Sequence, residues 1–221
     1  SYTGVVGTDI YGDKMIEALK RKDIDVSHLR KLKGNTAITE VELVDGERVF
    51  GDYDEGVLKY LTLSDEDINF LSGHDIVISG LWGNVQSYFK KIKESSTKIA
   101  FDAATRPMDS AAQEALPYVD YFFFASDDVF NVKIKSLMKD LYEKGPKLVI
   151  VTLGELGSVV YDGKNYEKFG IIPCTVVDTM GAGDSYIAGF LTGILENKEI
   201  KEAMKLGAQT ASETLSYNGA W

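Results

Sequence analysis

The chain has 221 residues, of which 44% are hydrophobic, and its 24 basic and 34 acidic side chains give a formal net charge of −10. This apolar fraction excludes intrinsic disorder, and the acidic balance argues against a nucleic-acid-binding surface. No apolar run approaches the roughly 20 residues of a membrane-spanning helix, which argues against a membrane-spanning protein. A single cysteine, Cys174, cannot form an internal disulfide, so we expect a reducing, cytoplasmic compartment.

The sequence opens without an initiator methionine or a secretory signal. Residues 2–6 are predicted to form a strand that the chain enters midway, so we expect further sequence to precede Ser1.

Residues 37–44 and 47–50 alternate between apolar and polar side chains, with Asp45-Gly46 between them. This pattern predicts a β-hairpin. We assign residues 35–57 to a small antiparallel lid. The sequence leaves open whether this segment closes over a site, joins two subunits or is an ordinary edge hairpin.

The rest of the chain alternates short apolar runs with longer amphipathic stretches, which predicts a doubly wound α/β domain over residues 1–34 and 58–221. Because the apolar runs are continuous, they are typical of parallel strands with helices on both faces. The predicted strands cover 75–79, 98–102, 121–125, 148–153 and 158–161, and the predicted helices cover 85–93, 108–116, 129–144, 183–195 and 199–216.

The segment Asp178-Thr179-Met180-Gly181-Ala182-Gly183-Asp184 carries the clearest chemistry. A strand-like approach over residues 175–177 is predicted to lead into the small residues and then a helix. Backbone amides at such a turn, together with the helix N-terminus, bind anions. Asp184 could then accept a proton from a substrate hydroxyl, or it could merely cap the helix. The fixed spacing favours catalysis.

This segment resembles the C-terminal signature of the ribokinase-like (PfkB) carbohydrate kinases. The resemblance implies that family's fold and ATP-dependent, magnesium-requiring phosphoryl transfer to a sugar. It also implies that Asp184 is the catalytic base, and that Gly181, Ala182 and Gly183 form the cradle for developing phosphate charge.

Other segments match the same family. Thr152, Gly154 and Gly157 stand where the family lines the nucleotide, although alone they would predict only a hairpin. The last helix carries small residues that indicate close helix packing. By resemblance, its Ala211 and the following Asn218 border the adenine.

The resemblance also implies substrate-binding residues. Asn35 leads into the predicted lid, and Arg106 ends an Asp-x-x-x-Arg pattern that begins at Asp102. Arg106 is either a sugar or phosphate ligand or a solvated surface residue. Trp82 either stacks on the sugar or packs in the core. Near the start, Asp9 is predicted to cap a helix and Gly12 to form a turn.

Two motifs of the family are absent. Ser126-Asp127-Asp128-Val129 replaces its Asn-x-x-Glu, so the metal ligands stay unassigned, and its opening Gly-Gly-Asn is missing. His28, His74 and Cys174 lie in no ligand-spaced cluster, which predicts structural roles.

Segments 48–57, 80–83 and 217–221 resemble the branch that phosphorylates fructosamines such as fructoselysine on the 6-hydroxyl. The alternatives are a kinase for ribose, fructose or 2-keto-3-deoxygluconate, and a non-catalytic sugar- or nucleotide-binding member. A monovalent cation is a further candidate cofactor, and a homodimer through the lid is a candidate assembly.

Overall fold

A computed structural model describes residues 1–44 and 47–220, with side chains described for residues 1–41 and 51–220. The chain divides into two compact units, Ser1–Phe70 with Gly83–Val85, and Leu71–Trp82 with the residues from Gln86 onward. Within the described residues, no helix has the length and apolarity needed to cross a membrane.

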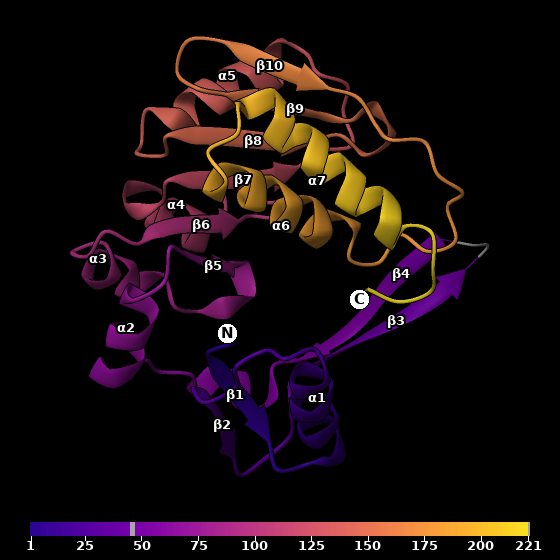
Figure 1. Cartoon of the computed structure of the whole chain (residues 1–221). Helices are drawn as coiled ribbons and strands as arrows, with labels where there is room; N and C mark the ends of the chain where they lie inside the picture. The colour runs from indigo at the N-terminus through magenta and orange to yellow at the C-terminus, as the bar shows by residue number, and fades with distance from the viewer. Residues whose placement is uncertain (45–46, 221) are drawn as a thin grey trace. The chain divides into compact units, whose positions relative to one another are not determined.

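The larger unit is built on a six-stranded sheet with the order β10-β9-β8-β7-β6-β5 (Figure 1). Strands β5 to β8 run parallel, whereas β8–β9 and β9–β10 are antiparallel. The strands are β5 (Ile76–Gly80), β6 (Lys98–Asp102), β7 (Tyr121–Ala125), β8 (Leu148–Thr152), β9 (Ser158–Tyr161) and β10 (Tyr166–Phe169).

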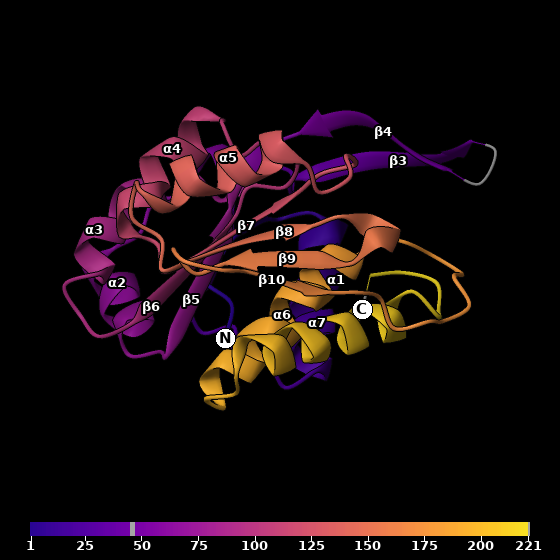
Figure 2. The same cartoon turned by 90° about the horizontal axis from the view of Figure 1, so that it is seen from above.

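Helices cover both faces of this sheet, which confirms the doubly wound prediction (Figure 2). On one face lie α3 (Phe89–Ile92), α4 (Ser110–Ala115) and α5 (Val132–Tyr142), and on the other lie α6 (Ala182–Leu195) and α7 (Ile200–Thr214). Short 3₁₀ turns complete the unit at η2 (Leu81–Gly83), η3 (Gln86–Tyr88), η4 (Leu116–Tyr118) and η5 (Gly154–Leu156).

The aromatic strand β7 shows why the sheet needs both layers. Successive side chains of a strand point to opposite faces. Phe122 stacks on Phe101 with ring centroids 6.1 Å apart, and Phe101 in turn meets Phe89 of α3. On the other face, Phe123 meets Phe190 of α6 edge-on at 5.6 Å. All five rings are buried, so the strand supplies core to both layers.

Glycines let α6 and α7 pack closely. A Cβ atom on Gly189 would lie 2.7 Å from the Leu206 carbonyl oxygen, and one on Gly207 would lie 2.8 Å from the Tyr186 carbonyl oxygen. Neither backbone position leaves room for a side chain. The small-residue face predicted for the last helix is therefore a packing face, as its sequence indicated.

The strand-like approach predicted at residues 175–177 is wrong. The structure places no strand between Phe169 and Ala182, a stretch that it describes throughout. Val176 and Val177 are exposed, and the Val177 N–H donates to the Leu215 carbonyl at 2.7 Å. Two β-branched residues without a neighbouring strand or a covering layer do not form a strand.

The smaller unit contains two separate two-stranded sheets. Strands β1 (Gly4–Gly7) and β2 (Leu29–Leu32), which are connected by helix α1 (Ile10–Arg21), form a parallel pair. Strand β3 (Ile38–Val44) pairs antiparallel with β4 (Glu47–Asp54). Turn η1 (Gly56–Tyr60) and most of helix α2 (Asp65–Ser72) follow. The β3–β4 pairing confirms the predicted hairpin, whereas its predicted turn, residues 45–46, lies outside the described residues. The assignment of residues 35–57 to a lid stays a prediction.

Asp9 ties α1 to the base of this hairpin. Its Oδ1 accepts from the Gly12 N–H at 2.9 Å, which confirms the predicted cap, and also from the Thr36 hydroxyl at 2.6 Å. Its Oδ2 accepts from the Thr36 N–H at 2.8 Å. These hydrogen bonds, led by that of the Thr36 hydroxyl, lower the pKa of Asp9. The hairpin therefore starts from a fixed point.

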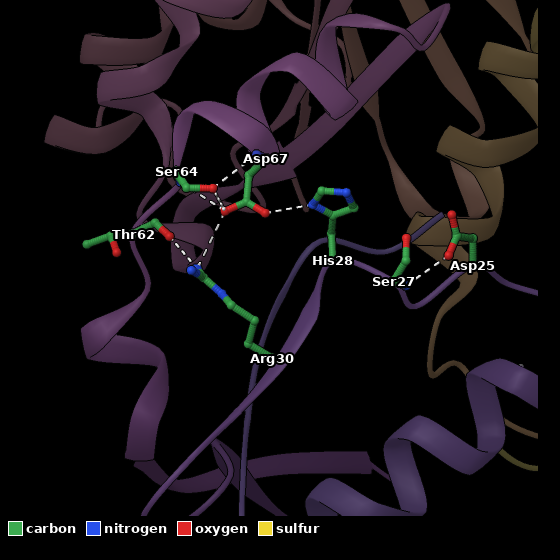
Figure 3. Close-up of polar contacts among 7 residues, drawn as sticks. All are labelled: Asp25, Ser27, His28, Arg30, Thr62, Ser64 and Asp67. Carbon is green, nitrogen blue, oxygen red and sulfur yellow. Dashed lines mark hydrogen bonds and ion pairs between the residues drawn. The ribbon is translucent and has the colours of Figure 1, made fainter.

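A buried carboxylate, Asp67, holds the start of α2 against β2 and the turn before it (Figure 3). Its Oδ2 accepts from the Ser64 N–H and hydroxyl, both at 2.9 Å, while its own N–H donates back to the Ser64 hydroxyl. His28 Nδ1 lies 2.7 Å from Oδ1, and the His28 ring stacks on Phe70 at 3.9 Å. Arg30 Nη2 lies 3.7 Å from Oδ2 and donates to the Thr62 carbonyl. His28 is thus structural, as predicted.

We expect Asp67→Asn to lower the free energy of unfolding at pH 7 by on the order of 2 kcal/mol, below the loss for a fully buried pair because Arg30 is partly exposed. Burial alone raises the pKa of Asp67, but the hydrogen bonds from His28 and Ser64 and the charge of Arg30 outweigh burial and lower it. The stabilisation is therefore complete above the ordinary pKa of 3.8 and is lost as the pH falls through the folded-state value.

Urea denaturation of both proteins at pH 7 and at stepwise lower pH measures this difference. Glu66→Gln is the control, because Glu66 is exposed in the same first turn and its replacement removes the same charge. Equal losses in the two variants would show that Asp67 acts only through the helix dipole.

Candidate active site

The signature segment ends at the N-terminus of α6. Gly181 is the N-cap residue and has a left-handed backbone with φ +76°. A Cβ atom there would lie 2.7 Å from the carbonyl oxygen of Ala220 and 2.9 Å from its Cα. Only glycine meets both the conformation and the close approach of the C-terminal loop.

The first turn of α6 has amides that no capping side chain occupies. The first N–H groups of a helix have no intrahelical acceptor, and Gly181 has no side chain to supply one. The Ala182 N–H makes only a long hydrogen bond of 3.4 Å to the Thr179 carbonyl. A Cβ atom added to Gly183 would meet no described atom outside its own helix within 4 Å, so the space beside it is open. The partial positive charge of the 14-residue helix adds to these donors. This end of α6 fits the oxygens of a phosphate group.

Asp184 lies in that same first turn, and its side chain is exposed to solvent. It is not the cap of the helix, because Gly181 holds the cap position. Desolvation by the surrounding protein raises its pKa above 3.8. A carboxylate with a raised pKa binds a proton more readily, which suits a general base.

Asp102, the last residue of β6, lies close enough to Asp184 for their charges to interact. Burial raises the pKa of Asp102, and the negative charge of Asp184 raises it further against a partly offsetting hydrogen bond from the Ala104 N–H. Sequence analysis named Asp102 only as part of a pattern and missed this pairing. The position of Asp102 at the carboxyl end of a parallel strand is a signal that could have placed it at the site edge, because sites in such sheets form there.

Arg106 and Trp82 form an exposed pair at the same edge. The guanidinium carbon of Arg106 lies 5.6 Å from the centroid of the Trp82 ring, and its Nη2 lies 3.1 Å from Asp109 Oδ2. Trp82 is 51% exposed, so the core-packing alternative is wrong for this residue. Arg106 is exposed but held by two partners, unlike a freely solvated arginine.

Asp178 braces the segment from the other side. Its Oδ1 accepts from the Met180 N–H at 2.8 Å, and its Oδ2 accepts from the Gly219 N–H at 2.9 Å. Ser185 of α6 and Thr214 of α7 share a further hydrogen bond of 2.7 Å between their hydroxyls. These contacts hold the C-terminal loop that contains Asn218 beside the start of α6.

The three residues predicted to line the nucleotide lie at the turn from β8 to β9. Thr152 ends β8, and its carbonyl accepts from the Ser126 N–H at 3.0 Å. Gly157 has φ +86°, and a Cβ there would lie 2.2 Å from the Phe169 carbonyl oxygen, so its glycine is structural. Gly154 has φ +56° and open space around it. Ala211 lies half-buried on α7.

The predicted sugar ligand Asn35 belongs to the smaller unit. Its side chain is exposed, and its carbonyl accepts from the Val57 N–H at 2.8 Å. The neighbouring Thr36 is gripped by Asp9, so the backbone at Asn35 is fixed while its side chain stays available.

Comparison with known proteins decides the family. The family described as pfkB family carbohydrate kinase matches residues 1–221, the whole chain. The chain belongs to this family. It is 41% identical over 216 residues to the fructoselysine 6-kinases of Shigella flexneri and Escherichia coli (strain K12), covering 98% of this chain and 82% of each relative. It is 29% identical over 225 residues to the fructosamine kinase FrlD of Bacillus subtilis (strain 168), covering 100% of this chain and 79% of that protein.

The structure agrees with the family at the level of the fold. A ribokinase of Arabidopsis thaliana, solved with ribose and ATP, superposes with a TM-score of 0.88 at 24% identity, covering 99% of this chain and 76% of that one. This pfkB family kinase therefore has the ribokinase-like α/β fold. It is a phosphotransferase that acts on an alcohol group of a carbohydrate and uses ATP.

The residues of this kinase fit ATP and Mg²⁺ in different ways. The uncapped amides of α6 suit phosphate oxygens directly. Among the described side chains, no three His, Cys, Asp or Glu residues form a metal-binding group. Mg²⁺ in kinases is held largely by substrate phosphates and water, with one or two carboxylates, so this arrangement still fits the ion. Asp127 and Asp128 are exposed, and the metal ligands stay unassigned.

Proposed function

We propose that this kinase transfers the γ-phosphoryl group of ATP to the 6-hydroxyl of a fructosamine, with fructoselysine as its substrate. The observation that carries the proposal is the identity of 41% to fructoselysine 6-kinases over 98% of the chain. The segments 48–57, 80–83 and 217–221, which resemble the same branch, support it from the sequence.

In the proposed mechanism Asp184 is the general base. Its Oδ accepts the proton of the sugar hydroxyl as that oxygen attacks the γ-phosphorus, and ADP leaves with the electrons of the broken P–O bond. The amides of Gly181, Ala182 and Gly183 donate to the phosphoryl oxygens, where negative charge develops. Mg²⁺, when bound with the nucleotide, supplies further neutralisation of phosphate charge. The partly desolvated carboxyl of Asp102 lies near Asp184, so the proposed base has a second carboxyl beside it.

The proposed nucleotide site lies around Thr152, Gly154 and Gly157, with Ala211 and Asn218 at its border. Four exposed apolar side chains of the larger unit support it. They lie on the β8–β9 turn and on the segment before α6, and each is at least half exposed: Leu156, Ile171, Val176 and Val177. A purine ring would cover apolar surface of this kind.

Arg106 and Asp184 of the larger unit are proposed to bind the sugar, and Asn35 of the smaller unit is proposed separately as a further sugar ligand. Support comes from the exposure of the Arg106 and Asn35 side chains and from the fixed backbone under each of them. The Arg106 N–H donates to the Ala103 carbonyl at 2.8 Å, and the Asn35 carbonyl accepts from Val57.

A coupled assay of ADP production tests the function. Fructoselysine, ribose, fructose and 2-keto-3-deoxygluconate are compared at equal concentrations, and kcat/KM is expected to be highest for fructoselysine. A higher value for any of the other three would replace the proposed substrate. No ADP with any sugar would favour a non-catalytic binding protein. Replacing sodium with potassium in the same assay tests the monovalent cation.

We further propose that the β3–β4 hairpin joins two copies of the chain. It is a separate two-stranded sheet, and such ribbons are marginally stable alone and leave strand edges unpaired. Tyr53 on β4 is 44% exposed, which adds apolar surface for a partner. Analytical ultracentrifugation is expected to give twice the mass of the chain, and a monomer over the full concentration range would refute the assembly.

A further inference from the structure

Trp82 and Arg106 are brought together by the sheet. Strands β5 and β6 are parallel neighbours whose last residues, Gly80 and Asp102, are register partners. Trp82 follows β5 in turn η2, and Arg106 follows β6 in the segment before α4. Both side chains therefore start from the edge of the sheet at which Asp102 feels the charge of Asp184.

The cation–π contact with the indole does not use the N–H groups of the Arg106 guanidinium as hydrogen-bond donors. The central carbon of Arg106 lies over the Trp82 ring, 5.6 Å from its centroid, which is within the range of a cation–π contact. A guanidinium has five N–H donors that lie in its plane and point outward, so an arginine held by an aromatic ring and one carboxylate can still donate to an oxyanion.

Asp109 locks the same arginine from its edge. Its Oδ2 lies 3.1 Å from Arg106 Nη2, while its Oδ1 accepts from the Ala111 N–H at 3.0 Å and so caps α4. The Asp109 N–H also donates to the Arg106 carbonyl at 3.0 Å. The Asp109 carboxylate is therefore itself held in place, and Arg106 lies between this carboxylate and the Trp82 ring.

The charges at this edge indicate which ligand the arginine serves. Asp102 and Asp184 both repel an anionic substrate, and Arg106 is a cation on the same edge that can offset this repulsion. The phosphoryl group already has the α6 amides as donors. A planar carboxylate on the sugar substrate is the group that the fork of a guanidinium matches.

We propose that Trp82 is a positioning residue that presents Arg106 to the carboxylate of an amino-acid-bearing sugar. This inference rests on the proposed function and names the part of the substrate that the site distinguishes. Trp82 acts through Arg106, and Arg106 contacts the substrate. The indole is exposed because the group that it positions binds at the surface.

Two substrates test the proposal, namely fructoselysine and a 1-deoxy-1-alkylaminofructose of the same chain length without the carboxylate. For Trp82→Ala and Arg106→Gln, KM for fructoselysine is expected to rise roughly 10- to 100-fold, the loss typical of a hydrogen bond to a charged group. For both variants the rise in KM should be at least about fivefold smaller for the carboxylate-free sugar than for fructoselysine, and the fall in kcat/KM should come mainly from KM. Trp82→Phe keeps an aromatic face and should restore most of the affinity.

Tyr60→Ala is the matched control, because Tyr60 is also an exposed aromatic residue with a cation, Lys59, 5.2 Å from its ring. An equal loss of affinity for the two sugars, or a raised KM for ATP, would assign Arg106 to the phosphate and overturn the proposal. Unchanged kinetics in the variants would overturn it as well. If the wild-type enzyme phosphorylates only sugars without a carboxylate, the proposed function fails and this inference fails with it. If the two variants lose affinity selectively for the sugar that carries the carboxylate, the result supports both the proposed function and this inference.

Discussion

Replacing Asp184 with asparagine is expected to lower kcat by about 10²- to 10⁴-fold, the contribution of a general base. The amide cannot take the proton of the sugar hydroxyl, whereas the uncapped donors of α6 stay in place. ADP affinity, measured by calorimetry, should therefore match the wild-type value. Glu196→Gln at the opposite end of α6 removes the same charge and should leave kcat unchanged. Turnover by Asp184→Asn near the wild-type rate would remove Asp184 from the role of base.

The same substitution is expected to raise the melting temperature at neutral pH. Because desolvation raises the folded-state pKa of Asp184, the folded protein is less stable once that carboxyl ionises. This cost is absent below the unfolded-state pKa and reaches its full value above the folded-state pKa. The gain from asparagine should therefore disappear in acid. In wild type, the acidic limb of kcat/KM should lie above the pH expected for a solvated aspartate.

A higher melting temperature together with a lower kcat in Asp184→Asn would distinguish a catalytic Asp184 from one that merely caps the helix. A capping aspartate stabilises its helix, and its removal lowers the melting temperature. The structure already places Gly181 at the cap position, with no side-chain hydrogen bond. The thermal measurement thus tests the role of Asp184 independently of any sugar.

The sheet of the larger unit was predictable because its signals are local. Strands over residues 98–102, 121–125 and 158–161 match their predicted bounds, since each is a short apolar run between polar or turn residues. Strand β10 (Tyr166–Phe169) was missed because two of its four residues are charged, and its pairing with β9 decides its conformation. Helix α2 was missed because it is short and depends on the buried contacts of Asp67.

The candidate site likewise has one part that the sequence was able to predict and another part that it was not. The cradle and Asp184 follow from one continuous segment, so their sequence was sufficient to place them on a helix start. The brace from Asp178 to Gly219 spans 41 residues. The pair Asp102–Asp184 joins the end of β6 to the start of α6, and the pair Trp82–Arg106 joins the segments that follow β5 and β6. Contacts of this kind depend on strand order, which no local pattern specifies.

Gly181→Ala is expected to impair both stability and turnover. A left-handed backbone costs an alanine about 1–2 kcal/mol relative to glycine. In addition, its Cβ would approach the Ala220 carbonyl oxygen to 2.7 Å, so the C-terminal loop or the start of α6 must move. Displacement of the cradle amides should lower kcat by about 10²- to 10³-fold, the loss typical of one oxyanion donor.

Gly183→Ala isolates the catalytic part of this effect. Gly183 lies in the first turn of α6, a Cβ there would have no described atom outside the helix within 4 Å, and its φ is not left-handed. Alanine should therefore fold normally and stabilise the helix by up to about 1 kcal/mol. If the phosphoryl group passes through this open space, the added methyl group lowers kcat without lowering the melting temperature. Thermal melts and steady-state kinetics of the two variants measure both properties. Full activity in Gly183→Ala would move the phosphoryl path away from this turn, and full stability in Gly181→Ala would contradict the close approach of Ala220.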